Sequence, residues 1–422
     1  MKPYYSDLSQ YLVTGFWIDS GSVPHDFGDA SSGRRTITYD ISDLTSAGQK
    51  LAVAALHAWE NVADVRFVEN RSGTPMILFD DRETGAWTSY RFLISSGSTI
   101  GVDINISQQW LRSYGTGYDD YSFQTYIHEI GHALGLGHAG DYNNWATFAK
   151  DAIFDCDSVQ VSIMSYFEPW QNPNVAAKFE TVLTPQLADI LAVQSIYGAP
   201  SDVRQGDTTY GVGTNLKAGR WQLEKFDATW SLTLVDSGGE DTLDMSMSDA
   251  RQVIRLGAGS FSSVDGGRNN LAIAPGTEIE NARSGGGQDR LVGNGADNTL
   301  WGRADDDSLS GRWGKDRLYG NSGDDTLNGG KHADLLRGGK GRDTFVFQSG
   351  SGRDRVTDFT DDVDRIELDT ALWTRDLGAR GVVRAFATVQ ADGDVVFDFG
   401  DDVLVVKDVG DRWLLADDLV LA

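Results

Sequence analysis

The middle of the first half of the chain reads His128-Glu129-Ile130-Gly131-His132-Ala133-Leu134-Gly135-Leu136-Gly137-His138. This stretch fits the pattern H-E-x-x-H-x-x-G-x-x-H, in which each fixed residue has a chemical role set by its spacing. Two histidines four residues apart lie on one face of a helix, where both can bind one metal ion. Gly135 can adopt the left-handed conformation that ends a helix, and the turn then brings His138 to the same metal. Three protein ligands leave the fourth tetrahedral position open, as a catalytic zinc site requires.

Chance is a weak explanation of this grouping. The chain has 6 His, and three of them fall within these eleven residues, whereas the others show no grouping. We therefore predict that His128, His132 and His138 bind one catalytic Zn²⁺. Glu129 lies beside them and is predicted to be the general base that takes a proton from the attacking water.

A second segment, Ser162-Ile163-Met164-Ser165-Tyr166, follows the third histidine. On its own it reads as a buried turn. After the histidine pattern it favours the Met-turn of metzincins, in which Met164 is an apolar floor beneath the metal and has a structural role only. Tyr166 is then predicted to turn its hydroxyl toward the zinc or toward the oxyanion formed in catalysis.

Residues 1–199 read as an α+β domain. Apolar residues at helical spacing predict an amphipathic helix over 51–62, and a helix over about 122–134 carries the histidines, with Ser122 as its N-cap. Another helix is expected to start with Thr184 as N-cap and Pro185 in its first turn, and to end before Gly198. Short apolar or alternating runs predict strands at 65–68, 76–79 and 102–104.

Residues 200–422 have a different sequence pattern, with a nine-residue repeat that runs from 284 to 346. Aspartates share one register, with Asn298 filling a slot, at Asp289, Asp307, Asp316, Asp325, Asp334 and Asp343. Two residues later come Leu291, Leu300, Leu309, Leu318, Leu327, Leu336 and Phe345. Two residues after these come Gly293, Gly302, Gly311, Gly320, Gly329 and Gly338. This is the nonapeptide calcium repeat G-G-x-G-x-D-x-U-x, which predicts an all-β parallel β-roll.

The physics of the repeat explains its period. Each unit is a glycine-rich turn and a short strand whose leucine points inward. The glycines permit positive φ, so that turn carbonyls converge on a cation, and the aspartates supply the hard oxygen that Ca²⁺ prefers. Stacked aspartates would repel one another without calcium, so folding is expected to depend on it. The alternative, a flexible Gly/Asp linker, does not explain seven repeats in phase. Replacements at Ala296, Arg303, Asp305, Arg312 and His332 weaken the case for individual calcium sites, above all from 296 to 307.

These motifs resemble the serralysin family of secreted bacterial metalloproteases. The matching segments are Thr125–His138, Gly140–Asn143, Ser162–Phe167, Thr184–Ala192, Gly15–Trp17 and Thr45–Ala52. The resemblance implies a metzincin-like catalytic domain followed by an RTX β-roll, with broad specificity toward extended peptides of extracellular proteins. It also implies that Tyr166 is a movable further zinc ligand.

The resemblance implies more calcium sites at the start of the roll. Their ligands would be Arg204, Gly206, Thr208, Asp236, Gly238 and Asp241 in one site, and Gly239, Asp241, Glu278 and Glu280 in a neighbouring one. Without the resemblance, residues 236–241 read simply as an acidic turn.

The composition of the chain excludes some classes of binding partner. A net charge of −26 and a pI of about 4.4 argue against nucleic acid or an anionic membrane. No stretch approaches the ~20 apolar residues of a membrane span. Cys156 is the single cysteine, which excludes an intrachain disulfide, and its role is open. The first residues lack the apolar core of a signal peptide, and Met1 is either a native start or one added at a processed end.

We expect a monomer that is secreted to the extracellular space by a bacterial type I apparatus. The last residues, 417–422, resemble the family's C-terminal secretion signal, acidic and then apolar, although a final β-strand explains them equally well. Protein substrates, the secretion apparatus and a small periplasmic protein inhibitor are the expected partners. A function of another class stays open, that of a calcium-dependent binding protein whose protease half is inactive.

Overall fold

The structure, a computed structural model, describes residues 5–28, 34–143, 145–178, 180–217, 219–226 and 229–422. The chain forms two compact units whose sequences interleave. The first contains residues 1–205, 217–237 and 267–277, and the second contains 206–216, 238–266 and 278–422. The predicted boundary between residues 199 and 200 stays a prediction. Among the described residues, no helix is long and apolar enough to cross a membrane.

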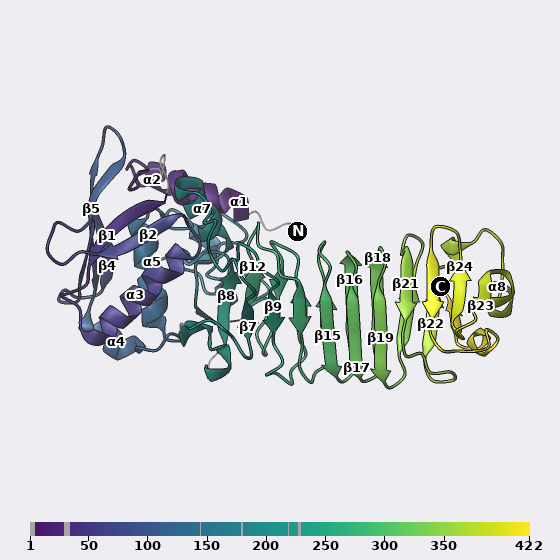
Figure 1. The fold of residues 1–422 in the computed structure, drawn as a ribbon. Helices are drawn as coiled ribbons and strands as arrows, with labels where there is room; N and C mark the ends of the chain where they lie inside the picture. Colours follow the sequence, from purple (N-terminus) through teal and green to yellow (C-terminus); the bar gives the residue numbers. More distant parts are fainter. Residues whose placement is uncertain (1–4, 29–33, 144, 179, 218, 227–228) are drawn as a thin grey trace. The chain divides into compact units, whose positions relative to one another are not determined.

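The first unit is built on a mixed sheet in the order β2-β1-β3-β5-β4 (Figure 1). Its strands are β1 (Arg35–Asp40), β2 (Val65–Glu69), β3 (Ile77–Asp80), β4 (Ala86–Leu93) and β5 (Ser98–Ile106). The pairs are parallel except for β4, which runs antiparallel to β5 and forms one edge. Short strands β6 (Thr181–Val182), β8 (Trp230–Leu234) and β12 (Leu271–Ile273) pair in parallel elsewhere in this unit. The three predicted strands are thus present, with β5 longer than expected.

Two long helices cross in the core of the first unit. They are α3 (Ser46–Glu60) and α5 (Tyr121–Ala133), the helix that carries the first two histidines. Trp59 is fully buried, and its indole Nε1 donates a hydrogen bond to the Ile127 carbonyl at 3.0 Å, so the helices are joined as well as packed. The other α-helices are α1 (Tyr5–Gln10), α2 (Phe16–Asp19), α4 (Gln108–Tyr114), α6 (Phe148–Asp151) and α7 (Leu187–Tyr197), and a π-helical turn, η1 (Tyr11–Gly15), joins α1 to α2.

The helix predicted over 51–62 is α3, which begins five residues earlier at Ser46, and two of the expected N-caps were wrong. The N-cap position of α5 is Asp120, and Ser122 lies inside the helix with no exposed surface. Helix α7 begins at Leu187, where Gln186 and Asp189 form a capping box. Thr184 is not its cap, because its hydroxyl accepts the Thr233 backbone N–H at 2.8 Å instead. A tertiary hydrogen bond therefore displaced the capping signal of Thr184, whereas Ser122 was displaced by its burial inside the helix.

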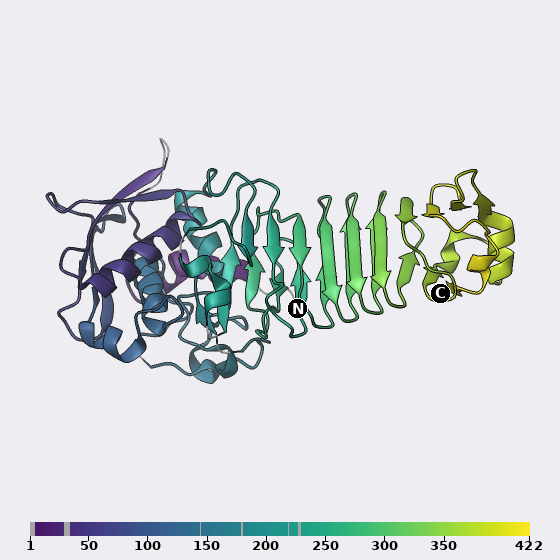
Figure 2. The ribbon, with the colours of Figure 1, turned by 60° about the horizontal axis from the view of Figure 1, so that its bottom comes forward.

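The second unit is a roll of two parallel sheets, shown in green in Figures 1 and 2. One sheet has the order β10-β14-β16-β18-β20-β22-β26, and the other ends in β21-β19-β17-β15-β13-β9-β7. The strands of the first are β10 (Val253–Arg255), β14 (Arg290–Val292), β16 (Ser308–Trp313), β18 (Thr326–Lys331), β20 (Thr344–Phe347), β22 (Arg365–Leu368) and β26 (Leu419–Leu421). Those of the second are β7 (Thr209–Gly211), β9 (Thr242–Asp244), β13 (Asn281–Arg283), β15 (Thr299–Ala304), β17 (Arg317–Ser322), β19 (Leu335–Lys340) and β21 (Arg353–Val356). Strand β11 (Phe261–Ser262) also belongs to this unit.

The core of the roll is the predicted leucine stack. The repeat leucines and Phe345 are at most 1% exposed, and Leu309 pairs in register with Leu291 and Leu327 on neighbouring strands. Consecutive repeats alternate between the two sheets, so one full coil takes two repeats. The parallel β-roll is therefore confirmed.

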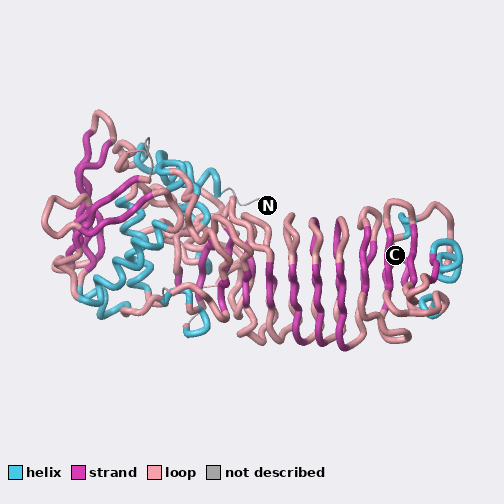
Figure 3. The backbone as a smooth tube through the Cα atoms, in the orientation of Figure 1, coloured by secondary structure: helices cyan, strands magenta, loops and turns pink. Residues whose placement is uncertain are grey.

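The end of the roll is not purely parallel. Strands β23 (Ala387–Val389), β24 (Val395–Asp398) and β25 (Val403–Val406) join the second sheet, with antiparallel pairs among them, and α8 (Ala379–Phe386) lies nearby in yellow-green (Figure 3 colours it as helix). The last residues form β26, which pairs in parallel with β22. The strand interpretation of the C-terminal residues is thus confirmed, and the secretion signal stays a prediction.

Candidate metal centre and catalytic site

Three histidine side chains converge at the end of α5. One donor atom each from His128, His132 and His138 lies within 4.8 Å of the others. Each ring is held by a backbone carbonyl on its Nδ1, with a distance of 2.8 Å to Ile163 O, Leu136 O and Tyr142 O respectively. These hydrogen bonds fix the tautomer and point the Nε2 atoms toward one another, as metal ligation requires.

The electrostatics of the cluster also suits a metal. The Nε2 atoms of His132 and His138 are 3.1 Å apart. Burial, with a smaller contribution from the neighbouring histidines, lowers the pKa of the His132 ring well below its usual value and that of His138 to about 3. Neutral imidazoles that face each other at this distance are suited to share a cation. The donor set therefore fits zinc.

The turn after the helix is built by Gly135. Its φ is +100°, and a Cβ at this position would lie 2.4 Å from the His25 carbonyl oxygen, so only glycine fits. The Leu136 N–H bonds back to the Gly131 carbonyl at 3.0 Å. The chain reverses here and returns with His138, as the spacing predicted.

Met164 packs directly beneath the helix. It has no exposed surface, and a Cβ on Gly131 would lie 2.7 Å from its sulfur. The turn that contains Met164 is anchored by a residue whose role the sequence did not reveal. The carboxylate of Asp189, fully buried on α7, accepts the Ser162 hydroxyl at 2.6 Å and the Ile163 N–H at 2.7 Å. Asp189 thus positions the carbonyl that holds His128.

Glu129 lies on α5, and its carboxylate faces the edge strand β4. Its side chain is 7% exposed, and its Oε2 accepts the Thr88 hydroxyl at 2.6 Å. Burial raises the pKa of the Glu129 carboxyl, while the adjacent His128 and the Thr88 hydroxyl oppose the rise. A raised pKa moves a carboxylate toward the range in which it works as a general base. Thr88 is a second residue that no sequence motif indicated.

Tyr166 lies beside the histidines. Its ring centroid is 4.5 Å from that of His138 and 6.2 Å from that of His128. Its backbone N–H donates to the Tyr142 hydroxyl at 3.4 Å, and that hydroxyl donates to the Asp157 carboxylate. The predicted zinc and catalytic residues of the first unit are therefore gathered in one place. Cys156 is buried, with its thiol pKa raised to about 11 by burial, and no role emerges for it.

The repeat aspartates of the second unit form two rows. From Asp307 onward, the Oδ1 of each accepts the backbone N–H of the residue eighteen positions earlier at 2.7–3.0 Å. One row contains Asp289, Asp307, Asp325 and Asp343, and the other Asn298, Asp316 and Asp334. Both rows continue past the recognised repeats, to Asp364 and Asp354. The ladder ties successive coils together.

The second carboxylate oxygen of the row aspartates, Oδ2, is the atom available to bind a cation. In the described residues the Oδ2 atoms of five buried aspartates have no hydrogen-bond partner, namely Asp307, Asp316, Asp325, Asp334 and Asp354. Burial raises the pKa of Asp307 and Asp354 to about 8 and that of Asp316 and Asp325 to about 7, with neighbouring aspartates adding to the rise. Asp334 and Asp343 are raised to about 6 by burial. Buried hard oxygens without partners fit Ca²⁺.

The repeat glycines have two roles. The predicted one, positive φ, is confirmed at turn positions such as Gly323, Gly330 and Gly339. A Cβ on Gly302, Gly320 or Gly338 would lie 2.1–2.3 Å from the Oδ2 of the aspartate five residues later. These positions therefore need glycine because the carboxylate approaches the backbone closely, and not for positive φ. Positive φ falls on neighbouring positions, where Arg303, Arg312 and His332 adopt it at 80–90°. The replacements noted in the sequence thus leave the turn intact.

Among the calcium ligands implied at the start of the roll, Asp241 is hydrogen-bonded to Thr208 and Glu280. In the second unit, Asp241 Oδ1 accepts the Thr208 N–H at 2.7 Å, and its own N–H donates to Glu280 Oε2 at 2.6 Å. Gly206, Gly238, Gly239 and Glu278 belong to this unit as well, whereas Arg204 and Asp236 belong to the first. Calcium binding by this group stays a prediction.

Comparison with known proteins gives two family matches. The family described as Peptidase M10 serralysin C terminal matches residues 199–406, and Matrixin matches residues 32–148. Serralysin of Photorhabdus luminescens is 34% identical over 274 residues, which cover 62% of this chain and 56% of that protein. Metalloprotease AprA of Pseudomonas entomophila is 36% identical over 291 residues (65% and 58%), and Serralysin C of Dickeya chrysanthemi is 37% identical over 254 (57% and 52%). The aligned part of the chain thus spans little more than half the length of these curated relatives.

Proposed function

Because this chain belongs to the serralysin family, we propose that it is a zinc-dependent endopeptidase that hydrolyses extracellular proteins with its first unit. The observation that carries the proposal is the convergence of His128, His132 and His138 beside the buried carboxylate of Glu129. A bound zinc ion would supply Lewis acidity at the point where the three Nε2 atoms meet.

The side chains around the histidines can perform the proton transfers of peptide hydrolysis. Glu129 accepts a proton from the attacking water and delivers it to the leaving amine. Thr88 holds the Glu129 carboxylate in one orientation through its hydroxyl. Tyr166, beside His138, donates its hydroxyl to the oxyanion that forms on the scissile carbonyl.

The edge strand β4 supports an extended peptide as substrate. One side of β4 pairs with β5, and its other side forms the edge of the sheet. A peptide added to this edge would bind mainly through its backbone, which gives affinity with little dependence on sequence. Because Thr88 lies on β4 and touches Glu129, such a peptide would run past the general base.

The second unit is proposed to fold around several calcium ions, supported by the unpartnered Oδ2 atoms along the two aspartate rows. We also propose secretion by a type I apparatus, in which low calcium inside the cell keeps the roll unfolded until it emerges. A small periplasmic protein inhibitor and a monomeric state complete this proposal, and both rest on the family resemblance.

The test is cleavage of casein by the purified protein in calcium, with Glu129→Ala as the variant. Loss of the general base should lower kcat by about 10²–10⁴-fold. Glu224→Ala is the matched control, because Glu224 is exposed in the same unit. A zinc-selective chelator should abolish wild-type cleavage. Undiminished cleavage by Glu129→Ala would refute the mechanism, and no cleavage by the wild type would favour a calcium-dependent binding protein.

A further inference from the structure

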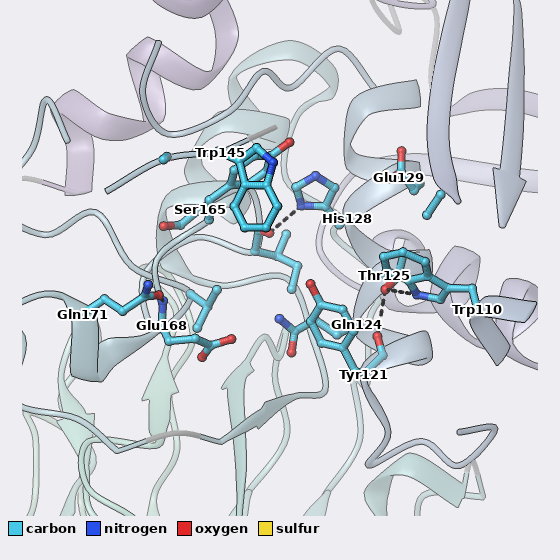
Figure 4. Close-up of a pocket in the computed structure, with 15 residues that line it drawn as sticks. Trp110, Tyr121, Gln124, Thr125, His128, Glu129, Trp145, Ser165, Glu168 and Gln171 are labelled. Atoms are coloured by element: carbon cyan, nitrogen blue, oxygen red, sulfur yellow. Dashed lines mark hydrogen bonds between the residues drawn. The ribbon is translucent and has the colours of Figure 1, made fainter. Parts of the chain in front are cut away.

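A cavity opens beside His128 and Glu129 (Figure 4). Its volume is about 420 Å³, within the ~300–1,000 Å³ typical of pockets that bind small ligands or side chains. One wall is α5, which contributes Tyr121 and Gln124, and the other is the segment that follows the methionine turn. The cavity therefore lies where the side chain of a residue next to a scissile bond would enter.

One acidic side chain faces this cavity from the second wall. Glu168 lines the pocket, and Figure 4 shows its carboxylate directed toward the side chain of Gln124. Its Oε2 is buried and has no hydrogen-bond partner within the described part of the chain, where no ion pair involves Glu168 either. A buried carboxylate oxygen without a partner is costly in free energy, so a ligand that supplies a donor and a positive charge gains from entering.

Hydrogen bonds hold the backbone of Glu168 in a short turn. The Glu168 N–H donates to the Gln171 Oε1 at 2.8 Å, and the Gln171 N–H returns to the Glu168 carbonyl at 2.9 Å. Pro169 follows at the start of the short 3₁₀ turn η2 (Pro169–Gln171), where its ring fixes φ. The carboxylate is therefore presented to the cavity from a rigid turn.

The other groups in the cavity suit the stem of a long side chain. Aromatic rings of Trp110, Tyr121 and Trp145 line it. Aliphatic stems of lysine and arginine pack on such surfaces while their charged ends seek a polar partner. Gln124 adds no charge, and its Oε1 is already engaged by the Val182 N–H at 3.3 Å. An apolar substrate side chain would leave Glu168 Oε2 without a partner, and an acidic one would be repelled.

We propose that Glu168 is a specificity-determining residue that selects a lysine or arginine side chain at one position beside the scissile bond. This inference rests on the proposed function, because it assumes that the histidine site cleaves peptides. It adds a side-chain preference to binding that is otherwise directed at the peptide backbone.

The experiment is cleavage-site profiling of the full-length holoenzyme on a peptide library. We expect Lys and Arg to be enriched at a single position flanking the cleaved bond. Glu168→Gln keeps the size of the side chain and removes its charge, and should lower kcat/KM for basic peptides by about tenfold or more, mainly through KM. Its kcat/KM for peptides with a neutral residue at that position should stay within about threefold of wild type.

Two further variants make the result decisive. Glu168→Lys should shift the preference at the same position toward Asp and Glu, which a purely structural role would not do. Glu224→Gln, the same change at an exposed site, should leave the profile unaltered. Wild-type cleavage without basic enrichment, or an unchanged profile in Glu168→Gln, would overturn the inference while leaving the proposed protease intact. A wild type that cleaves no library peptide and no casein would overturn both.

Discussion

The histidine site of the first unit and the aspartate rows of the second both gather side chains suited to a metal ion. They differ in how many of the polar atoms of these side chains have hydrogen-bond partners within the protein. Each histidine in the first is held by a carbonyl at 2.8 Å, and Glu129 is held by Thr88. In the second, five buried aspartates each leave one oxygen without a partner. The first site is therefore organised before a metal binds, whereas the second requires a cation to offset buried negative charge.

The largest expected difference is the response to removal of each metal. Calcium removal by EGTA should weaken the β-roll signal in circular dichroism and lower the melting temperature by more than about 10 °C, because binding to the folded state alone stabilises it. A zinc-selective chelator should abolish casein cleavage and leave the spectrum nearly unchanged.

Two outcomes would break this comparison. A roll whose spectrum and melting temperature are indifferent to EGTA would show that the aspartate rows need no cation. A spectrum lost on zinc removal would show that the histidine site is not organised in advance. Restoring calcium or zinc after chelation serves as the control for each.

A smaller effect is expected from pH in calcium-depleted buffer. The pKa of Asp334 is raised to about 6 in the folded roll and that of Asp307 to about 8, above the unfolded value of ~3.9. The folded state thus binds protons more tightly, and its stability is complete below the unfolded pKa and is lost as pH rises through about 6–8. The calcium-free roll should melt several degrees higher at about pH 5 than at about pH 9.

Thermal melts followed by circular dichroism check this expectation. Saturating calcium should largely remove the pH difference, because the cation then takes the place of the protons. A calcium-free roll that becomes more stable as the pH rises from 5 to 9 would contradict the role given to the aspartate rows.

The smallest expected effect comes from leaving a buried carboxylate oxygen without a partner in the first site, as in the aspartate rows of the second. Thr88→Val removes the hydroxyl that satisfies Glu129, so the free energy of unfolding should fall by about 1–3 kcal/mol. The kcat should fall by about 3- to 30-fold as the general base loses its orientation. Ser89→Ala, at the exposed next position of β4, is the matched control. A Thr88→Val enzyme with wild-type stability and kcat would show that Glu129 does not depend on this bond.

Much of both regions could be predicted because the residues that define them lie close together in the sequence. The histidine spacing within one helix and turn predicted the convergence of His128, His132 and His138, and the nine-residue period predicted the leucine stack. Contacts between distant segments left no such pattern. Asp189 supports the methionine turn from 26 residues away, and Thr88 reaches Glu129 from 41. Both partnerships exist only in the folded chain.

The same limit explains the local errors. Ser122 and Thr184 are good N-cap residues by type, but one is buried within α5 and the other bonds to Thr233. The need for glycine at Gly320 was not predicted, because the close approach of the Asp325 carboxylate depends on the folded conformation of the turn. A selective role for Glu168 could not be inferred before the cavity around it was seen.

The eighteen-residue step of the aspartate ladder also limits how such a roll can change its length over evolutionary time. Successive repeats alternate between the two sheets, and each row links residues eighteen apart. Gain or loss of a single nine-residue repeat would transfer every later strand to the opposite sheet and reverse the side on which the chain emerges. Duplication or deletion of two repeats together changes only the number of coils and keeps every later strand in its own sheet.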